Sequence, residues 1–206
     1  MRRLSPLSPH YGVERGQPID RYYIENFLAK YSADIKGRVL EIQSSGYTRQ
    51  FGKGRVNQSD VLDIDSANPQ ASLVVDLSKA DGIPSGQFDC FILTQSLQYM
   101  FDLKSALGHA FRILKPEGVL LVSVPAIARI DPGARATDYW RFTPMGLCKL
   151  MEEHTQPQNI EITVHGNVLS DFGFLMGLSH HELSERELNT TDTDFPLVLC
   201  ARAVKS

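Results

Sequence analysis

The residues with the clearest capacity for chemistry are acids that follow short apolar runs of the sequence. Asp63 and Asp65 lie at and just beyond the end of "DVLDI", and Asp76 follows "SLVV". A carboxylate in such a position can accept hydrogen bonds from both hydroxyls of a ribose, a task that neutral side chains perform less well. Because Asp also caps turns and helices often, a purely structural role is the alternative for each acid.

A second group of candidates follows the apolar run "RVLEI". Glu41 belongs to that run, and small or polar residues with a single glycine, Gly46, come directly after it. Glycine lets a backbone take a positive φ and approach a ligand closely, and Ser44 is small and can donate a hydrogen bond to a carboxylate. This stretch is therefore predicted to form a binding turn.

These candidates need a sheet that brings them together. Near-continuous runs of β-branched and large apolar residues predict five strands that are covered on both faces. The runs lie at 38–42, 60–64, 72–75, 88–94 and 118–124. Ligands bind outside the carboxyl ends of such strands, so Thr94 and Gln95, at and just after the end of the fourth strand, join the candidate site.

Helical patterns fill the intervals between strands. "LKSALGHAFRILKPEG" places its apolar residues on one helical face between the last two of these strands, which makes a βαβ unit. Pro18 is tolerated at the start of a helix that ends before Gly37, and Thr143 can cap a helix that begins at Pro144. With strands in "NIEITVHG" and "FPLVLCARAV", the pattern predicts an α/β layered domain with an open, mostly parallel sheet.

Length and composition favour one domain. The chain has 206 residues, of which 42% are hydrophobic, and prolines and glycines make residues 1–16 an irregular arm before a single domain at 17–206. A net charge of -3 disfavours extended nucleic-acid binding. The apolar runs are too short for a membrane span and the N-terminus lacks the apolar centre of a signal peptide, so a cytoplasmic protein is expected. Three cysteines without CxxC spacing predict no metal site.

Several longer stretches resemble a known family. "GRVLEI", "DVLDID", "FDCFILTQSLQYMFD", "RILKPEGVLLVSVP" and "DYWRFTPMGL" look like the class I S-adenosylmethionine-dependent methyltransferases, from about residue 17 to the end of the chain. More narrowly, "PIDRYYIENFL", "YTRQFG" and "DYWRFT" are similar to bacterial methyltransferase-like domains that accompany glycosyltransferases in surface-polysaccharide synthesis. The resemblance implies a three-layer αβα sandwich with a seven-stranded, mostly parallel sheet whose last strand, about 197–203, is antiparallel. It also implies S-adenosylmethionine as cofactor, a small-molecule or saccharide acceptor, and a glycosyltransferase partner.

The resemblance further implies the cofactor contacts. They are Glu41, Ser44 and Gly46 in the first turn, Asp63 or Asp65 at the ribose, Asp76 and Leu77 near the adenine, and Thr94 and Gln95 below the methionine part. The family has three glycines in the first turn, whereas this chain keeps only Gly46, so the long Gln43 side chain must point away from the cofactor or fill part of its place. The segment "SANPQA" is too short for the usual crossover helix and predicts a loop beside the adenine.

The helix before the first strand is expected to close over the methionine end of the cofactor. Arg21 can bind both oxygens of a carboxylate with its planar guanidinium, and Tyr22 or Tyr23 can supply a hydroxyl donor. The alternative for Arg21 is a surface ion pair with Glu25, four residues further along the helix.

The acceptor side is less sharply defined by the sequence. Methyl transfer to a hydroxyl needs a base, for which Asp138 is the candidate, and the alternative for Asp138 is an ion pair with Arg141. Many relatives have His where Gln98 and Tyr99 stand, and neither residue is a comparable base near neutral pH. The leading hypothesis is a methyltransferase enzyme, and the alternative is a non-catalytic module that scaffolds a glycosyltransferase or another partner.

Overall fold

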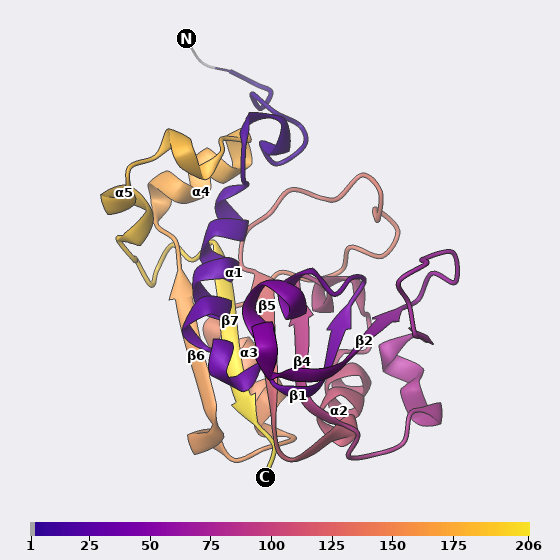
Figure 1. Ribbon diagram of the computed structural model, residues 1–206. Helices are drawn as coiled ribbons and strands as arrows, with labels where there is room; N and C mark the ends of the chain where they lie inside the picture. The colour runs from indigo at the N-terminus through magenta and orange to yellow at the C-terminus, as the bar shows by residue number, and fades with distance from the viewer. Residues whose placement is uncertain (1–2) are drawn as a thin grey trace.

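The predicted strands form one sheet in the computed structural model, which describes residues 3–206 (Figure 1). The strands are β1 (Gly37–Ile42), β2 (Val56–Asp63), β3 (Leu73–Val74), β4 (Phe88–Thr94), β5 (Leu114–Pro125), β6 (Ile160–His165) and β7 (Val198–Val204). Their spatial order is β3-β2-β1-β4-β5-β7-β6. β1 to β5 pair in parallel, and β7 lies antiparallel between β5 and β6. The predicted seven-stranded, mostly parallel sheet with an antiparallel last strand is confirmed.

Two strands begin earlier than their apolar runs indicate. β2 starts at Val56, because Gln58 and Ser59 pair with β1 although both are exposed to solvent. β5 starts at Leu114, which pairs with Phe88 of β4 ahead of an irregularity in the register. Backbone pairing thus continues into polar strand ends, which a hydrophobic pattern does not mark.

Helices cover both faces of the sheet and complete the αβα sandwich (Figure 1). They are α1 (Ile19–Lys30), α2 (Leu103–Ile113), α3 (Pro144–Glu152), α4 (Val168–Met176) and α5 (Glu185–Asn189). Phe91 of β4 packs in the core beneath α2 and α3, whereas Cys90 and Ile92 pack in the core beneath α1. Successive strand residues face opposite sides, so covering both faces requires the continuous apolar runs seen in the sequence.

Two predictions from short sequence motifs, the start of α3 and the loop between β2 and β3, also agree with the structure. The Thr143 hydroxyl accepts a hydrogen bond from the amide of Gly146 at 3.1 Å, and Pro144 occupies the first turn of α3, as predicted. Between β2 and β3 the chain forms turns and no helix, so the predicted loop at "SANPQA" is confirmed.

The arm at the N-terminus lies against α4 (Figure 1). The amides of Leu7 and Ser8 donate to the carbonyl of Met176 at 2.7 and 3.2 Å, and the ring of Tyr11 stacks on Phe174 with 5.5 Å between centroids. Gly12 has φ +80°, and a Cβ there would lie 2.8 Å from the carbonyl oxygen of Gly177, so the contact requires glycine. The arm is therefore irregular, as predicted, but it is packed onto the domain.

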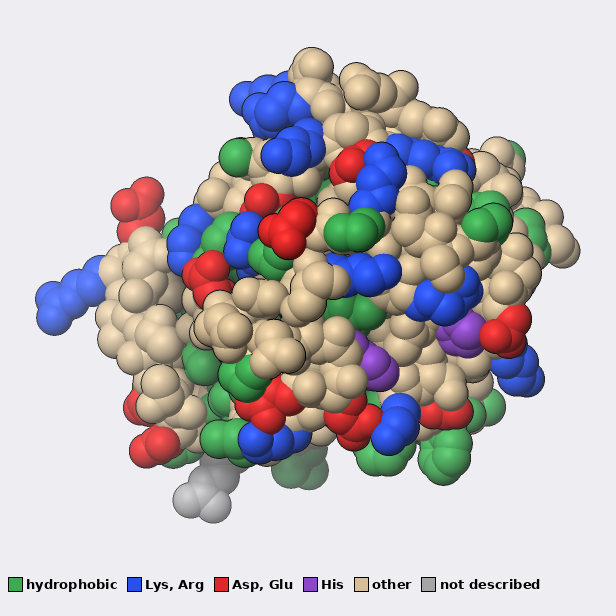
Figure 2. All heavy atoms as spheres, turned by 90° about the horizontal axis from the view of Figure 1, so that it is seen from below, with side chains coloured by type: hydrophobic (Ala, Val, Ile, Leu, Met, Phe, Trp, Pro, Cys, Tyr) green, Lys and Arg blue, Asp and Glu red, His purple; other side chains and the backbone are tan. Residues whose placement is uncertain are grey.

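The lower face of the molecule carries charges of both signs. Figure 2 shows acidic and basic side chains intermixed over the described part of this face, with no extended basic area. Among residues 3–206, none of the helices combines the length and the apolar character that crossing a membrane requires.

Candidate functional site

Two pockets lie side by side at the carboxyl ends of the parallel strands. The strand-end pocket, about 410 Å³, is lined by residues that include Asp63, Val75, Asp76, Leu77, Ser96 and Phe101. The arm pocket, about 270 Å³, is lined by residues that include Tyr11, Asp20, Arg21, Gln95, Arg129 and Asp131. Gln43 and Tyr99 line both pockets, so the two spaces adjoin at these side chains.

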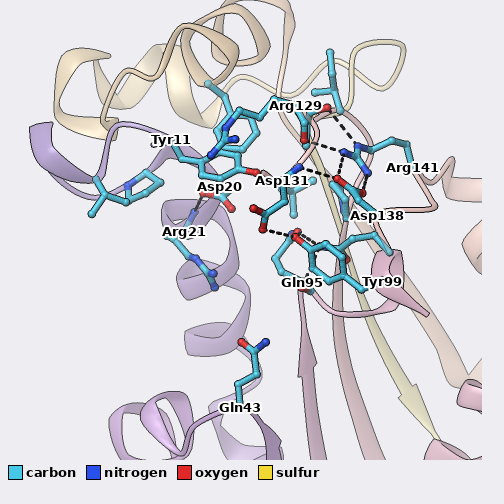
Figure 3. Close-up of a pocket in the computed structure, with 18 residues that line it drawn as sticks. Tyr11, Asp20, Arg21, Gln43, Gln95, Tyr99, Arg129, Asp131, Asp138 and Arg141 are labelled. Carbon is cyan, nitrogen blue, oxygen red and sulfur yellow. Dashed lines mark hydrogen bonds and ion pairs between the residues drawn. The ribbon is translucent and has the colours of Figure 1, made fainter. Parts of the chain in front are cut away.

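The turn after β1 places Gln43 at this junction. Gln43 has φ +64°, a conformation that glycine adopts freely and other residues seldom do. Its amide donates to Leu62 O at 2.9 Å, and its carbonyl accepts from Asn68 Nδ2 at 2.6 Å. These bonds hold the backbone of the turn, and the side chain points into the space below Arg21 (Figure 3). The chain thus keeps a glycine-like turn although it lacks the glycine.

Glu41 stabilises the turn after β1 by accepting hydrogen bonds from its backbone. The side chain is only 2% exposed, and its two oxygens accept hydrogen bonds from the amides of Tyr47 at 3.0 Å and Thr48 at 2.7 Å. Burial raises the pKa of Glu41, and the bonds from Thr48 and Tyr47 oppose that change. Glu41, Ser44 and Gly46 line neither pocket, so the structure places these three predicted contacts in the support of the turn.

The structure distinguishes the two acids that follow β2. Asp63 lines the strand-end pocket and accepts hydrogen bonds from Asn68 Nδ2 at 2.6 Å and from the amide of Asp65 at 3.0 Å. Asp65 is exposed outside the pocket and accepts from the amide of Ala67 at 2.8 Å. Of the two acids, Asp63 therefore faces the strand-end pocket, and Asp65 caps the loop.

The end of β3 supplies the next part of the strand-end pocket. Asp76 lines it and also caps the short helix Leu77–Gly82, accepting from the amide of Ser78 at 2.9 Å. Leu77 is buried and forms an apolar wall of the same pocket. Both predicted residues lie beside this pocket, although the carboxylate of Asp76 already serves as a cap.

The turn after β4 contributes to the arm pocket. Gln95 has φ +48°, lines that pocket, and donates through its amide to Ser123 O at 2.8 Å, whereas Thr94 lines neither pocket. Gln98 is only 4% exposed, and its Nε2 donates to the carbonyl of Gln95 at 3.0 Å. The buried atoms Gln95 Nε2 and Gln98 Oε1 have no hydrogen-bond partner.

Arg21 of α1 lies above Gln43, where the strand-end pocket and the arm pocket adjoin (Figure 3). It lines the arm pocket, its guanidinium points toward Gln43 (Figure 3), and its Nη1 donates to Tyr47 Oη at 3.1 Å. No ion pair joins Arg21 to Glu25 in the described part of the chain. The predicted alternative, an ion pair with Glu25, is therefore not formed, and the side-chain hydrogen bond of Arg21 within residues 3–206 is the one to Tyr47.

The expected hydroxyl donors of α1 point elsewhere. Tyr22 Oη donates to Asn189 Oδ1 at 3.0 Å, and Tyr23 Oη donates to the carbonyl of Leu188 at 2.9 Å. Both rings face α5, so the prediction for these two residues is wrong. Tyr47, from the turn after β1, supplies the hydroxyl beside Arg21 instead.

Asp138 forms the ion pair that was the alternative to a catalytic role. Its side chain is 1% exposed, it pairs with Arg141 Nη1 at 2.5 Å, and it accepts from the amide of Asp131 at 2.9 Å. The hydrogen bond from Arg141 lowers the pKa of Asp138 despite its burial. The carboxylate lines the arm pocket, but these contacts make it a weak base that fixes the loop between β5 and α3.

The arm pocket also contains residues that the sequence did not single out. Asp20 follows the start of α1, and Asp131 accepts a hydrogen bond from Tyr99 Oη at 3.1 Å. Burial raises the pKa of Asp20, and burial together with Asp131 raises the pKa of Tyr99 to about 12. Tyr11 comes from the arm, with the guanidinium of Arg129 3.9 Å from its ring centroid. The only local signal for this group was the Asp20-Arg21 pair in the first turn of a helix.

The described residues contain no arrangement of side chains that is typical of a metal site. No group of three or more His, Cys, Asp or Glu side chains within 3–206 is arranged to hold an ion. His165, at the end of β6, is half-buried and stacks on Tyr23 at 5.2 Å between ring centroids, outside both pockets. The site consists of carboxylates, amides, tyrosines and guanidinium groups.

Comparisons with known proteins show similarity in part of the sequence and in the fold. A family model described as a methyltransferase domain matches residues 25–122, just under half of the chain. A search of curated sequences finds no match. The fold is similar to a SAM dependent methyltransferase from Archaeoglobus fulgidus, with a TM-score of 0.61 and 16% identity over 90% of this chain and 94% of that one.

Two further solved structures share the fold. The N-methyltransferase NodS from Bradyrhizobium japonicum, in complex with S-adenosyl-l-homocysteine, matches with a TM-score of 0.61 and 14% identity over 97% of this chain and 94% of that one. The cyclase SpnF matches with a TM-score of 0.58 and 15% identity over 89% of this chain and 80% of that one. At such identities the likeness establishes the fold and leaves the reaction open.

The fold agrees with the predicted methyltransferase-like architecture, and the family model for a methyltransferase domain matches part of the chain, residues 25–122. S-adenosylmethionine is the cofactor that such a domain implies. None of the reported matches supports the narrower resemblance to domains that accompany glycosyltransferases, nor a saccharide acceptor or a role in polysaccharide synthesis.

Proposed function

We propose that this chain is an S-adenosylmethionine-dependent methyltransferase that acts on a small-molecule acceptor. The observation that carries the proposal is the pair of adjoining pockets at the carboxyl ends of the strands, which meet at Gln43 and Tyr99. One pocket offers a carboxylate beside apolar walls, as an adenosine requires, and the other offers carboxylates and tyrosines to a second molecule.

The residues present fit the cofactor. Asp63 would accept from the ribose hydroxyls, and the apolar side chains of Val75 and Leu77 would cover the adenine. Arg21, with the hydroxyl of Tyr47 beside it, would hold the carboxylate of the methionine part. The turn at Gln43 fits as well, because a positive φ brings its backbone close to the junction of the pockets.

The chemistry of the reaction needs little from the protein beyond alignment. When bound, the cofactor supplies a methyl group on a positively charged sulfur, and the sulfur keeps the electron pair of the carbon–sulfur bond that breaks as the acceptor attacks the methyl carbon. The chain's own residues would exclude water, hold the acceptor in line and remove its proton. Asp20 and Asp131 line the arm pocket, and neither forms an ion pair in the described residues, so they suit the last task better than Asp138.

Calorimetric titration with S-adenosylhomocysteine tests the proposal. The parent protein is expected to bind, and Asp63→Ala is expected to weaken binding about tenfold or more, because hydrogen bonds to a charged group contribute about 1.5 to 3 kcal/mol. Asp65→Ala removes a neighbouring carboxylate outside the pocket and is expected to leave affinity unchanged. Binding that is equal in all three proteins would refute the assignment of Asp63.

A non-catalytic module is the second candidate, and the observation that favours it is the side chain of Gln43 at the junction of the pockets. In that case the side chain would occupy space that the cofactor needs. The same titration separates the candidates, because a module of this kind would show no binding of S-adenosylhomocysteine or S-adenosylmethionine by the parent protein.

A further inference from the structure

The arm pocket contains two acids that have no ion-pair partner within residues 3–206, Asp20 and Asp131. Burial raises the pKa of Asp20, and the nearby charge of Arg21 opposes that change. Figure 3 shows the carboxylates of Asp20 and Asp131 pointing toward the same space below Tyr11. Both acids help to raise the pKa of Tyr11, although burial is the larger cause and Arg129 opposes it.

Two like charges that face one partly enclosed space repel each other unless a cation lies between them. Arg129 does not take that place, since its guanidinium is held 3.9 Å from the centroid of the Tyr11 ring and is paired with neither acid. The guanidinium of Arg21 points away toward Gln43 (Figure 3). The position between the carboxylates is therefore suited to a positively charged group of a ligand.

A separate observation also indicates a hydrogen-bond donor as the ligand. Gln98 lines the arm pocket and is 4% exposed, and its buried Oε1 accepts no hydrogen bond from residues 3–206. An alkylammonium group carries three N–H donors, which suits the two carboxylates of Asp20 and Asp131, and a rotation of the Gln98 side chain would bring its Oε1 to the third donor. A hydroxyl group has one donor and no charge, and so satisfies fewer of these atoms.

We infer that the arm pocket binds the protonated amine of the acceptor, which makes the proposed methyltransferase an amine N-methyltransferase. This assignment rests on the proposed function and specifies the acceptor class. The side chains of Tyr11 and Tyr99 line the same pocket, and the guanidinium of Arg129 over the Tyr11 ring is an example of a cation beside an aromatic ring there. The hydroxyl of Tyr99 donates to Asp131 Oδ2 at 3.1 Å, which fixes the orientation of that carboxylate.

An ammonium nitrogen has no free electron pair, so it must lose a proton before it accepts a methyl group. The carboxylate of Asp20 accepts that proton, the N–H bond breaks, and its electron pair stays on nitrogen for the bond to the methyl carbon. Burial raises the pKa of Asp20, which makes it a stronger base than an exposed aspartate. The proton then passes from Asp20 to solvent when the product leaves.

Binding of matched amines and alcohols tests the inference. Benzylamine and butylamine are titrated against the parent protein by NMR, with and without S-adenosylhomocysteine, and compared with benzyl alcohol and butanol. Each amine is expected to bind at least tenfold more tightly than its alcohol. Asp20→Asn and Asp131→Asn are each expected to reduce that preference at least fivefold, and Asp81→Asn, whose side chain is 91% exposed elsewhere, is the control that keeps it.

Several outcomes would overturn the inference. Amines and alcohols of equal affinity would do so, as would an unchanged preference in both pocket variants when circular dichroism shows that they are folded. A tenfold loss of S-adenosylhomocysteine affinity in Asp20→Asn would assign Asp20 to the cofactor and refute the amine site while the proposed function stands. Failure of the parent protein to bind S-adenosylhomocysteine would refute the proposed function, and the titration without it still reports on the amine site.

Discussion

The strand-end pocket and the arm pocket adjoin each other but are built in different ways. The first has a wall of residues at the ends of β1, β2 and β3, which the sheet brings together, and this wall faces the segment after β4 and part of the loop between β5 and α3. The second joins the arm, α1, the turn after β4 and the loop between β5 and α3, which are distant in the sequence. The first therefore depends on the sheet, and the second depends on individual side-chain contacts between segments.

The largest expected effect concerns the loop that forms one wall of the arm pocket. Asp138→Asn leaves the guanidinium of Arg141 without its charged partner, and we expect a loss of about 3 kcal/mol in the free energy of unfolding, measured with urea. Because its pKa is lowered in the folded state, Asp138 stabilises the parent protein above the ordinary aspartate pKa, and this contribution disappears as pH falls through the lowered value. The variant should therefore show less acid sensitivity. Equal stability of variant and parent at pH 7 would contradict the structural role.

The next effect tests whether α1 serves the cofactor. Arg21→Ala is expected to lower the affinity for S-adenosylhomocysteine about tenfold or more, since a charge-assisted hydrogen bond contributes about 1.5 to 3 kcal/mol. The melting temperature should change little, because the guanidinium makes no ion pair in the described chain. Arg186→Ala on the exposed surface of α5 is the matched control and should bind like the parent. Affinity that is equal in Arg21→Ala and parent would leave α1 as scaffold.

A smaller effect concerns α4, the helix on which the arm rests. Asp171 is 8% exposed, its Oδ1 has no partner, and burial, helped by Asp192, raises its pKa to about 6. The folded state then binds the proton more tightly than the unfolded state, so stability falls as pH rises from about 4 to 6.

Asp171→Asn removes this penalty. It should stabilise the protein by about 1 to 2 kcal/mol at pH 7 and by much less near pH 4, where the aspartate is protonated in the folded state and about half protonated in the unfolded state. Thermal unfolding at the two pH values measures the difference, with the exposed Asp194→Asn as a control that is neutral at both. A stabilisation of equal size at pH 4 and pH 7 would argue against a titrating carboxyl group.

The smallest effect lies at the junction of the pockets. Gln43→Gly relieves the strain of φ +64° but gives the unfolded chain more freedom, so the free energy of unfolding should change by less than about 1 kcal/mol. If the side chain narrows the junction without closing it, affinity for S-adenosylhomocysteine should rise a few-fold in calorimetry. A gain of a hundredfold or more would mean that Gln43 blocks the site in the parent protein and would favour the non-catalytic module.

The sequence by itself determined the elements whose signals are local. Continuous apolar runs marked the parallel strands because both faces of the sheet are covered, and Thr143 with Pro144 marked the start of α3 because capping depends on adjacent residues. The arrangement of the sheet was implied by the family resemblance and not by these local patterns, and the observed strand order puts Asp63 and Leu77 beside the strand-end pocket. The sequence offered Asp63 and Asp65 as alternatives for the proposed ribose contact, and only side-chain direction at the strand end shows that, of the two, Asp63 lines the pocket.

Only the tertiary structure decided the arm pocket. Tyr11, Asp20, Tyr99 and Asp131 come from segments with no shared periodicity, and they meet because α4 anchors the arm and the Asp138-Arg141 pair fixes the loop after β5. The same holds for Tyr22 and Tyr23, whose hydroxyls turn to α5 because that helix covers their side of α1. A side chain's direction on a helix depends on what packs against each face, and that information lies in contacts between distant residues.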